Sequence, residues 1–125
     1  MDYFNQNIVE AAKANTSFRR EMVTGANSQV VIMSLKPNED IGEEAHQVDQ
    51  TLVFVLGEGK AVVNGKESTV VSGSLVFVPA GAKHNFINTG MADMKLYTIY
   101  APPEHKPGTM HQTKKDAENE EHLPH

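Results

Sequence analysis

The sequence predicts an all-β protein, either a two-sheet sandwich or a closed barrel. About nine short β-prone segments follow one another at intervals of roughly eight to ten residues, a spacing typical of such folds. Gly, Pro and Asn punctuate these segments, and Asn64-Gly65 is the strongest hairpin signal in the chain. No long amphipathic helical pattern interrupts the series. Composition alone does not rank a jelly roll above an immunoglobulin-like sandwich.

Length and composition limit the class of protein. The 125 residues, 39% of them hydrophobic, suit one domain with its own core. Because the chain has no Cys, disulfides and thiolate metal sites are excluded, and we expect a cytoplasmic location. No apolar run approaches the roughly 20 residues that span a bilayer, and no signal-peptide pattern opens the chain. We therefore expect no membrane insertion.

The charge pattern argues against a nucleic-acid partner. The formal net charge is −5, and Lys and Arg are spread thinly except at Arg19-Arg20 and Lys114-Lys115. A phosphate backbone is bound by a concentrated basic surface, which this pattern lacks. We interpret both basic pairs as solvated surface.

The chain divides into three predicted parts. Residues 1–16 form a short N-terminal segment, helical or extended, in which residues 8–14 are compatible with a turn or two of helix. Residues 17–103 form the β-domain. Residues 104–125 form a tail rich in Lys, Glu and His and poor in apolar side chains. A capping pattern at 113–116 favours a short helix in the tail, and disorder is the competing interpretation.

Within the β-domain, strand-like runs alternate with turns. Met33 and Leu35 are expected to face the interior, on the same side as Val31. The run at 51–56 is apolar on both faces, which suits a strand buried on both sides or one at a subunit interface. This run is our main reason to expect a homodimer. The other runs are residues 17–24, 29–35, 60–63, 66–71, 75–78 and 94–100, together with the extended segment around His84.

The stretch from Gly73 to Asn88 (GSLVFVPAGAKHNFIN) indicates a strand, a turn and a second strand. Alternation along the second strand places His84, Phe86 and Asn88 on one face, so an imidazole follows a tight turn beside an apolar ring. This is a position for a metal ligand or a substrate contact. A lone strand histidine is more often structural, so the weight of His84 depends on the spacing around it.

That spacing resembles the second conserved motif of the cupin family at each defining position, namely Gly73, Pro79, Gly81, His84 and Asn88. Five fixed residues at fixed offsets make the resemblance fairly specific. It extends over about 85 residues, from about residue 30 to residue 103. Within it, residues 40–50 and 97–103 are similar to small single-domain bacterial cupins often labelled as resembling mannose-6-phosphate isomerase.

The first cupin motif is roughly His-x-His, three or four residues, Glu, six residues and Gly. The matching frame here is Glu44-Ala45-His46, then Gln50, then Gly57. Glu44 stands where the first His is expected and Gln50 where the Glu is expected. The charge of the set is unchanged at −1, because one carboxylate is still present.

The resemblance implies a cupin-type double-stranded β-helix, which is a jelly-roll barrel, with a divalent metal ion inside its mouth. The implied ligands are Glu44, His46, Gln50 and His84, and two His with one carboxylate suit Fe, Mn, Ni or Zn. A cupin that has lost its metal and kept a polar pocket is the alternative. Glu44 is also compatible with a solvated role, and Gln50 with a substrate-binding amide.

Strand alternation separates these residues from their neighbours. Glu44, His46 and Gln50 are spaced by two and four, so on an uninterrupted strand they share one face while Glu43 and Asp49 point away. A bulge would reverse that choice. Glu43 and Asp49 are our candidates for a general base.

Aromatic and tail residues complete the set of candidates. Phe54, Phe77 and Phe86 are better interpreted as core than as a stacking platform, and Phe54 and Phe86 are our candidates for an apolar wall of a substrate pocket. Four of the six histidines lie in the tail, and we expect them to be solvated. They are His105, His111, His122 and His125.

Two enzymatic functions and one non-enzymatic function remain open. A divalent ion can polarise an oxygen of a small polar substrate for isomerase-type or lyase-type chemistry, or Fe(II) can support dioxygenase chemistry. The alternative is a non-catalytic module that binds a metal ion or a small molecule. The expected partners are a small-molecule ligand and a second copy of the chain.

Overall fold

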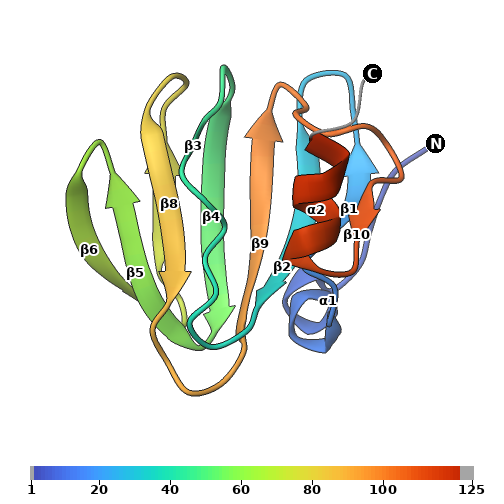
Figure 1. Ribbon diagram of the computed structural model, residues 1–125. Helices are drawn as coiled ribbons and strands as arrows, with labels where there is room; N and C mark the ends of the chain where they lie inside the picture. Colours follow the sequence, from blue (N-terminus) through green and yellow to red (C-terminus); the bar gives the residue numbers. More distant parts are fainter. Residues whose placement is uncertain (1, 122–125) are drawn as a thin grey trace.

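The structure is a computed structural model that describes residues 2–121, and most of its regular elements are β-strands (Figure 1). No helix within these residues is long and apolar enough to cross a membrane. In chain order the elements are α1 (Ile8–Ala14), β1 (Arg19–Thr24), β2 (Gln29–Leu35), β3 (Glu44–Ala45), β4 (Asp49–Leu56), β5 (Glu58–Val63), β6 (Lys66–Val71), β7 (Leu75–Val78), β8 (Lys83–Asn88), β9 (Met94–Ala101), β10 (Met110–His111) and α2 (Lys114–Glu121).

The strands form two antiparallel sheets. The larger sheet has the order β10-β1-β2-β9-β4-β7 and the smaller one has the order β3-β8-β5-β6. The predicted all-β jelly-roll fold is confirmed. The two sheets share no hydrogen-bonded strand pair among the described residues, so the fold consists of two packed sheets and is not a closed barrel.

The core lies between the two sheets. Phe54 and Phe86 are fully buried, with ring centroids 5.8 Å apart. Phe77 is 54% exposed, so its prediction as a core residue is wrong. Alternation along β7 turns Val78 inward and Phe77 outward. The main buried cluster comprises Phe18, Val31, Met33, Leu35, Val48, Leu52, Phe54, Ala61, Val70, Val78, Ala82, Phe86, Met94, Leu96, Tyr100 and Ala117.

Helix α1 covers part of the outer face of the six-stranded sheet. The side chain of Asn7 caps the helix by accepting the N–H of Glu10 at 3.0 Å. Ala12 then packs with Ile32 of β2 and Val55 of β4 in a second, smaller cluster. The apolar outer side of β4 is therefore buried in part by the protein's own helix, which explains why this strand is apolar on both faces.

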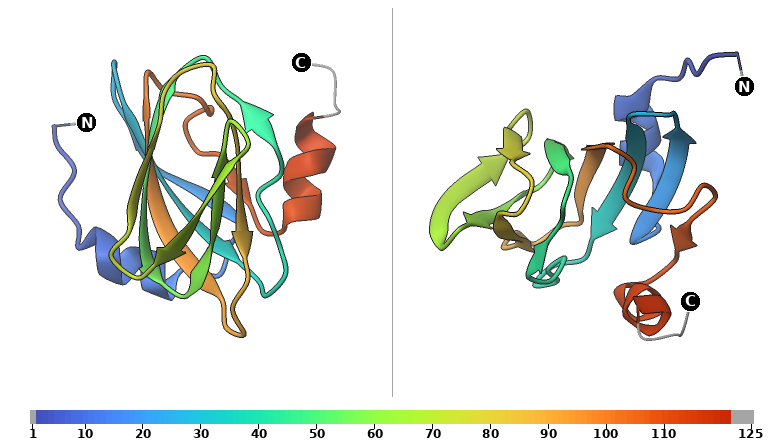
Figure 2. Two further views of the ribbon diagram at one scale, coloured as in Figure 1. Left: turned by 90° about the vertical axis from the view of Figure 1, so that its left-hand side faces the viewer. Right: turned by 90° about the horizontal axis from the view of Figure 1, so that it is seen from above.

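The C-terminal segment returns to the sheet. β10 pairs with β1, and His111 lies opposite Arg19 in the antiparallel register. The short helix predicted in the tail is present as α2, and its Ala117 belongs to the main core cluster. α1 and α2 lie on opposite faces of the six-stranded sheet near β1 and β2 (Figure 2).

Candidate functional site

Residues of the two sequence motifs meet where β3 and β4 approach β8. Glu44 of β3 pairs directly with His84 of β8, so two predicted metal ligands are neighbours across the sheet. The turn before β8 is tied to the first motif, because the Gly81 N–H donates to the His46 carbonyl oxygen at 2.7 Å. Gly81 has φ +87°, a conformation that glycine adopts without steric cost. Backbone contacts thus bring the motifs together.

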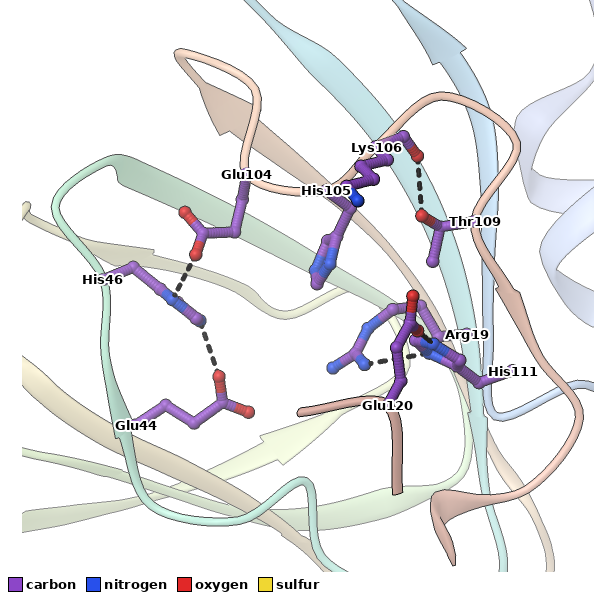
Figure 3. Close-up of a pocket in the computed structure, with 9 residues that line it drawn as sticks. All are labelled: Arg19, Glu44, His46, Glu104, His105, Lys106, Thr109, His111 and Glu120. Carbon is purple, nitrogen blue, oxygen red and sulfur yellow. Dashed lines mark hydrogen bonds and ion pairs between the residues drawn. The ribbon is translucent and has the colours of Figure 1, made fainter. Parts of the chain in front are cut away.

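His46 lies between two carboxylates, as Figure 3 shows. Its Nε2 is 2.9 Å from Glu44 Oε2, and its Nδ1 is 3.0 Å from Glu104 Oε1. Burial alone would lower the pKa of His46, but the hydrogen bond and charge of Glu44, with those of Glu104, raise it above its ordinary value. Burial would likewise raise the pKa of Glu44, and His46 lowers it. Without a metal ion this arrangement favours an imidazolium between two carboxylates.

His84 has a defined tautomer. It is 4% exposed, and its Nδ1 is 3.0 Å from the carbonyl oxygen of Ala82. A carbonyl oxygen only accepts hydrogen bonds, so Nδ1 carries a proton, and in the neutral ring Nε2 carries the lone pair. The ring centroids of His84 and His46 are 5.2 Å apart.

Gln50 lies on the buried face of β4, as alternation predicts, and is 3% exposed. Its Nε2 donates to Thr98 Oγ1 at 3.1 Å, whereas its Oε1 is buried and has no hydrogen-bond partner. A buried carbonyl oxygen without a protein partner is rare in folded proteins, so Gln50 Oε1 is available to accept from a ligand or a water or to bind an ion.

The donor chemistry of these four residues fits a divalent ion. Among residues 2–121, no three His, Cys, Asp or Glu side chains already converge as metal ligands, and His46 and Glu44 pair with each other. Each histidine nevertheless has an oxygen acceptor at Nδ1, and Gln50 offers an unused oxygen. Glu44, His46, His84 and Gln50 can therefore supply two imidazole nitrogens, a carboxylate and an amide oxygen.

A cavity of about 270 Å³ opens beside His46 (Figure 3). Most of its wall belongs to the C-terminal segment, which has the composition of a polar tail. The prediction of solvated tail histidines is wrong for His105 and His111, while His122 and His125 lie outside the described residues. The cavity is lined by Arg19, Glu44, His46, Glu104, His105, Lys106, Thr109, His111 and Glu120.

Arg19 also departs from expectation. It is 3% exposed, whereas Arg20 is exposed, because alternation along β1 turns the first inward and the second outward. Arg19 Nη1 donates to His111 Nδ1 at 3.3 Å. The proton of neutral His111 is therefore on Nε2, which contacts Glu120. The interpretation of Arg19-Arg20 as solvated surface is wrong for Arg19.

Three buried side-chain atoms in the described chain lack a hydrogen-bond partner, and two of them belong to cavity-lining residues. They are Arg19 Nε, His105 Nε2 and Gln50 Oε1. Burial lowers the pKa of His105 to about 3, so its imidazole is neutral. His105 packs edge-on against Tyr100 at a centroid distance of 5.2 Å, and burial raises the pKa of Tyr100 to about 12. Both rings are uncharged near neutral pH.

The remaining predicted site residues lie elsewhere. Glu43 and Asp49 are exposed and do not line this cavity, and Asp49 Oδ1 accepts the Ala80 N–H at 3.0 Å. The role of either residue as a general base stays a prediction, and Glu43 lines a separate cavity beside His84. Phe54 and Phe86 are fully buried in the core and do not line the cavity.

Comparison with known proteins places this geometry in a family. A family model described as "Cupin domain" matches residues 31–100, which is more than half of the chain. A solved structure, that of BH2720 from Bacillus halodurans, has a TM-score of 0.91 and 40% sequence identity, with 93% of each chain covered.

Two curated relatives add sequence similarity. The uncharacterized protein YrkC of Bacillus subtilis is 48% identical over 122 residues, covering 91% of this chain and 65% of that protein. The chain thus spans just under two thirds of that relative's length. A protein of Thermotoga maritima named oxalate-binding protein is 29% identical over 68 residues, covering 54% of this chain and 56% of that protein.

Proposed function

The chain belongs to the cupin family, and on that premise we propose that its cavity is a metal-dependent site for a small polar metabolite. Glu44, His46, His84 and Gln50 are the residues that would hold the ion. The observation that carries the proposal is the state of the two histidines, each of which has an oxygen acceptor at Nδ1, so Nε2 is the nitrogen that would face an ion. Nε2 of His46 contacts Glu44, the carboxylate of the same proposed ligand set. Such acceptors are the usual outer contacts of metal-bound histidines.

Isomerase-type or lyase-type chemistry is the activity that we favour. A divalent ion at this position supplies Lewis-acid polarisation of a carbonyl or enediol oxygen. Glu104 holds His46 in orientation, and Glu120 lines the opposite part of the cavity as a carboxylate within reach of a substrate proton. The narrower resemblance to mannose-6-phosphate-isomerase-like cupins agrees with this proposal by fold analogy only.

Dioxygenase chemistry is the second enzymatic candidate, and the donor set is the observation that favours it. Two histidines and one carboxylate suit Fe(II) with open coordination positions. Oxygen consumption together with bound iron would select this activity. Turnover without oxygen, with Mn, Ni or Zn bound, would select the isomerase or lyase.

A non-catalytic binding module is the alternative from another class. Each of the three cavity carboxylates already contacts an imidazole, since Glu44 and Glu104 pair with His46 and Glu120 pairs with His111. A site without an unengaged base suits binding better than proton abstraction. Ligand binding that persists without turnover across metals would select the module.

Metal content measured by mass spectrometry tests the proposal. A full-length chain with His122→Ala and His125→Ala removes two histidines of the terminus and serves as the parent. We expect close to one divalent ion per parent chain, and loss of the ion in His46→Ala and His84→Ala versions that remain folded by circular dichroism. Folded parent protein that takes up no divalent ion, and gains no thermal stability from one, would reject the metal site.

A further inference from the structure

We propose that the substrate binds through a carboxylate group and that the buried guanidinium of Arg19 is its receptor. The inference deepens the proposed function, because it rests on the cavity being a small-metabolite site. Neither sequence motif contains Arg19, and the cupin model begins after it, at residue 31. The assignment therefore comes from the geometry of β1 and the C-terminal segment.

The first observation is a buried charge without a direct ion pair. Arg19 is 97% buried, yet among residues 2–121 no carboxylate oxygen lies within 4.0 Å of its guanidinium nitrogens, the limit for an ion pair. Its charge lowers the pKa of Glu44 from a distance, and it reaches Glu120 only through His111. A buried charge is stable only when it is paired, so the guanidinium calls for an anion.

The second observation is an unused donor of Arg19, a side chain that otherwise contacts His111 and Tyr100. Nη1 contacts His111 Nδ1 at the long distance of 3.3 Å, while Nε is buried without any partner. Nε–H and a neighbouring Nη–H form the fork that binds both oxygens of a carboxylate. Figure 3 shows the guanidinium pointing into the space bounded by Glu44, His105 and Glu120.

His105 supplies a second unused contact on the same cavity. Its Nε2 is also buried without a partner, and its imidazole is neutral. A neutral imidazole exchanges one hydrogen bond with a ligand oxygen or hydroxyl without adding charge. Arg19 and His105 thus provide a charged fork and a neutral contact, which matches a small acid that carries a neighbouring oxygen function.

The surrounding charge favours a monocarboxylate over a phosphate. Glu44, Glu104 and Glu120 all line the cavity, and they repel a ligand in proportion to its negative charge. A phosphate group carries up to two negative charges and needs more donors than one guanidinium supplies. A volume of about 270 Å³ lies below the usual range of drug-sized pockets and suits a compact metabolite.

Paired probes, each an acid beside its amide, test the inference directly. Formate, acetate, lactate and pyruvate, with their amides, would be titrated into the full-length protein by calorimetry, together with inorganic phosphate. We expect at least one acid to bind at least tenfold more tightly than its amide. In Arg19→Gln the affinity for that acid should fall about 10- to 100-fold. Arg20→Gln is the matched control on the exposed side of β1 and should bind normally.

A spectroscopic measurement keeps the test decisive if Arg19→Gln fails to fold. The Arg19 Nε–H resonance, assigned by its loss in Arg19→Lys or by triple-resonance spectra of the native chain, should shift with the acid and not with its amide. An Nε–H signal that none of the four acids moves, with no acid binding preferred over its amide, would overturn the proposal. Tighter binding of phosphate than of any acid would also overturn it.

Metal analysis on the same samples separates this inference from the metal site. Arg19→Gln should retain the metal content of the parent while its affinity for the acid falls. A parent that binds metal and ignores all acids contradicts the carboxylate receptor and leaves the metal site intact. Acid binding by protein that takes up no metal supports the receptor and rejects the metal site.

Discussion

Glu104 and His46 are far apart in the sequence, yet Glu104 Oε1 is 3.0 Å from His46 Nδ1. The contact joins the segment after β9 to the first motif and fixes which nitrogen of His46 faces Glu44. A carboxylate in this position orients a metal-binding imidazole and strengthens its basicity. The C-terminal segment is therefore part of the site.

Glu104→Gln tests this positioning role. The amide keeps the size of the side chain and loses its charge, so we expect divalent-metal affinity to fall about 10- to 100-fold. Isothermal titration with the ion that the native protein carries would measure the effect. Glu118→Gln, an exposed change in α2, is the control and should leave affinity unchanged. Equal affinities for both variants would remove Glu104 from the site.

Asn88 has a structural role that the motif alone does not reveal. The side chain is fully buried, and its Nδ2 donates to the carbonyl oxygens of Leu35 and Ala92, each at 2.9 Å. Its Oδ1 accepts the Gly90 N–H at 2.9 Å. Asn88→Ala removes three hydrogen bonds to the backbone, one of them between buried groups, and we expect the free energy of unfolding to fall by about 2–4 kcal/mol.

Urea unfolding followed by circular dichroism measures this loss. Asn119→Ala, an exposed change in α2, is the control and should shift the free energy of unfolding by about 0.5 kcal/mol or less. Folded Asn88→Ala protein should carry the same metal content as the parent. A stable variant that has lost its metal would instead make Asn88 a site residue.

Strand alternation explains why much of the site was predictable. The side-chain period of two is fixed by the backbone, so the inward positions of Gln50, His84 and Phe86 follow once the strands are located. A bulge near the first motif would have turned Asp49 inward and Gln50 outward. The irregularity in β4 lies farther along the strand, between Phe54 and Leu56, so the predicted register holds.

The missed residues share one physical cause. Arg19, His105 and His111 enter the site through pairing between the two ends of the chain, and β10 is only two residues long. Two residues carry no measurable periodicity, and a Lys- and Glu-rich segment has the composition of a solvated tail. An inward position in β1 was the available signal for Arg19, because alternation separates it from Arg20.

Asp40 connects α2 to the loop after β2 and gives a pH dependence. It forms an ion pair with Lys114 and accepts a hydrogen bond from Asn85 Nδ2 at 2.9 Å. Burial would raise the pKa of Asp40, but the contacts with Lys114 and Asn85 lower it below its ordinary value. The stabilisation is therefore complete above the unfolded-state pKa of about 3.9 and is lost as pH falls through the lower folded-state pKa.

Unfolding of the parent and of Asp40→Asn, compared from pH 6 to pH 2, measures this contribution. We expect the parent to be more stable at pH 6 by about 0.5 kcal/mol or less, because the pair is partly exposed to solvent. The difference should vanish at the acid end of the range. A difference that is constant with pH would assign the stabilisation to packing and not to the charge of Asp40.

The outer face of β7 is where we expect the second copy of the chain in a homodimer. Leu75 and Phe77 are 62% and 54% exposed, and β7 pairs only with β4 among the described strands. Val53 of β4 lies opposite Leu75 in the register and extends the apolar row. Water contact with such a row is unfavourable, and α1 covers only another part of this sheet.

Sedimentation velocity on the parent and on Phe77→Lys tests the homodimer. We expect the parent to sediment as a dimer and Phe77→Lys as a folded monomer, because a buried unpaired Lys opposes association. Val71→Lys is the matched control, since Val71 is similarly exposed at 48% but lies on β6 of the other sheet. A monomeric parent contradicts the homodimer itself. A dimer that persists in Phe77→Lys and dissociates in Val71→Lys moves the interface from β7 to β6.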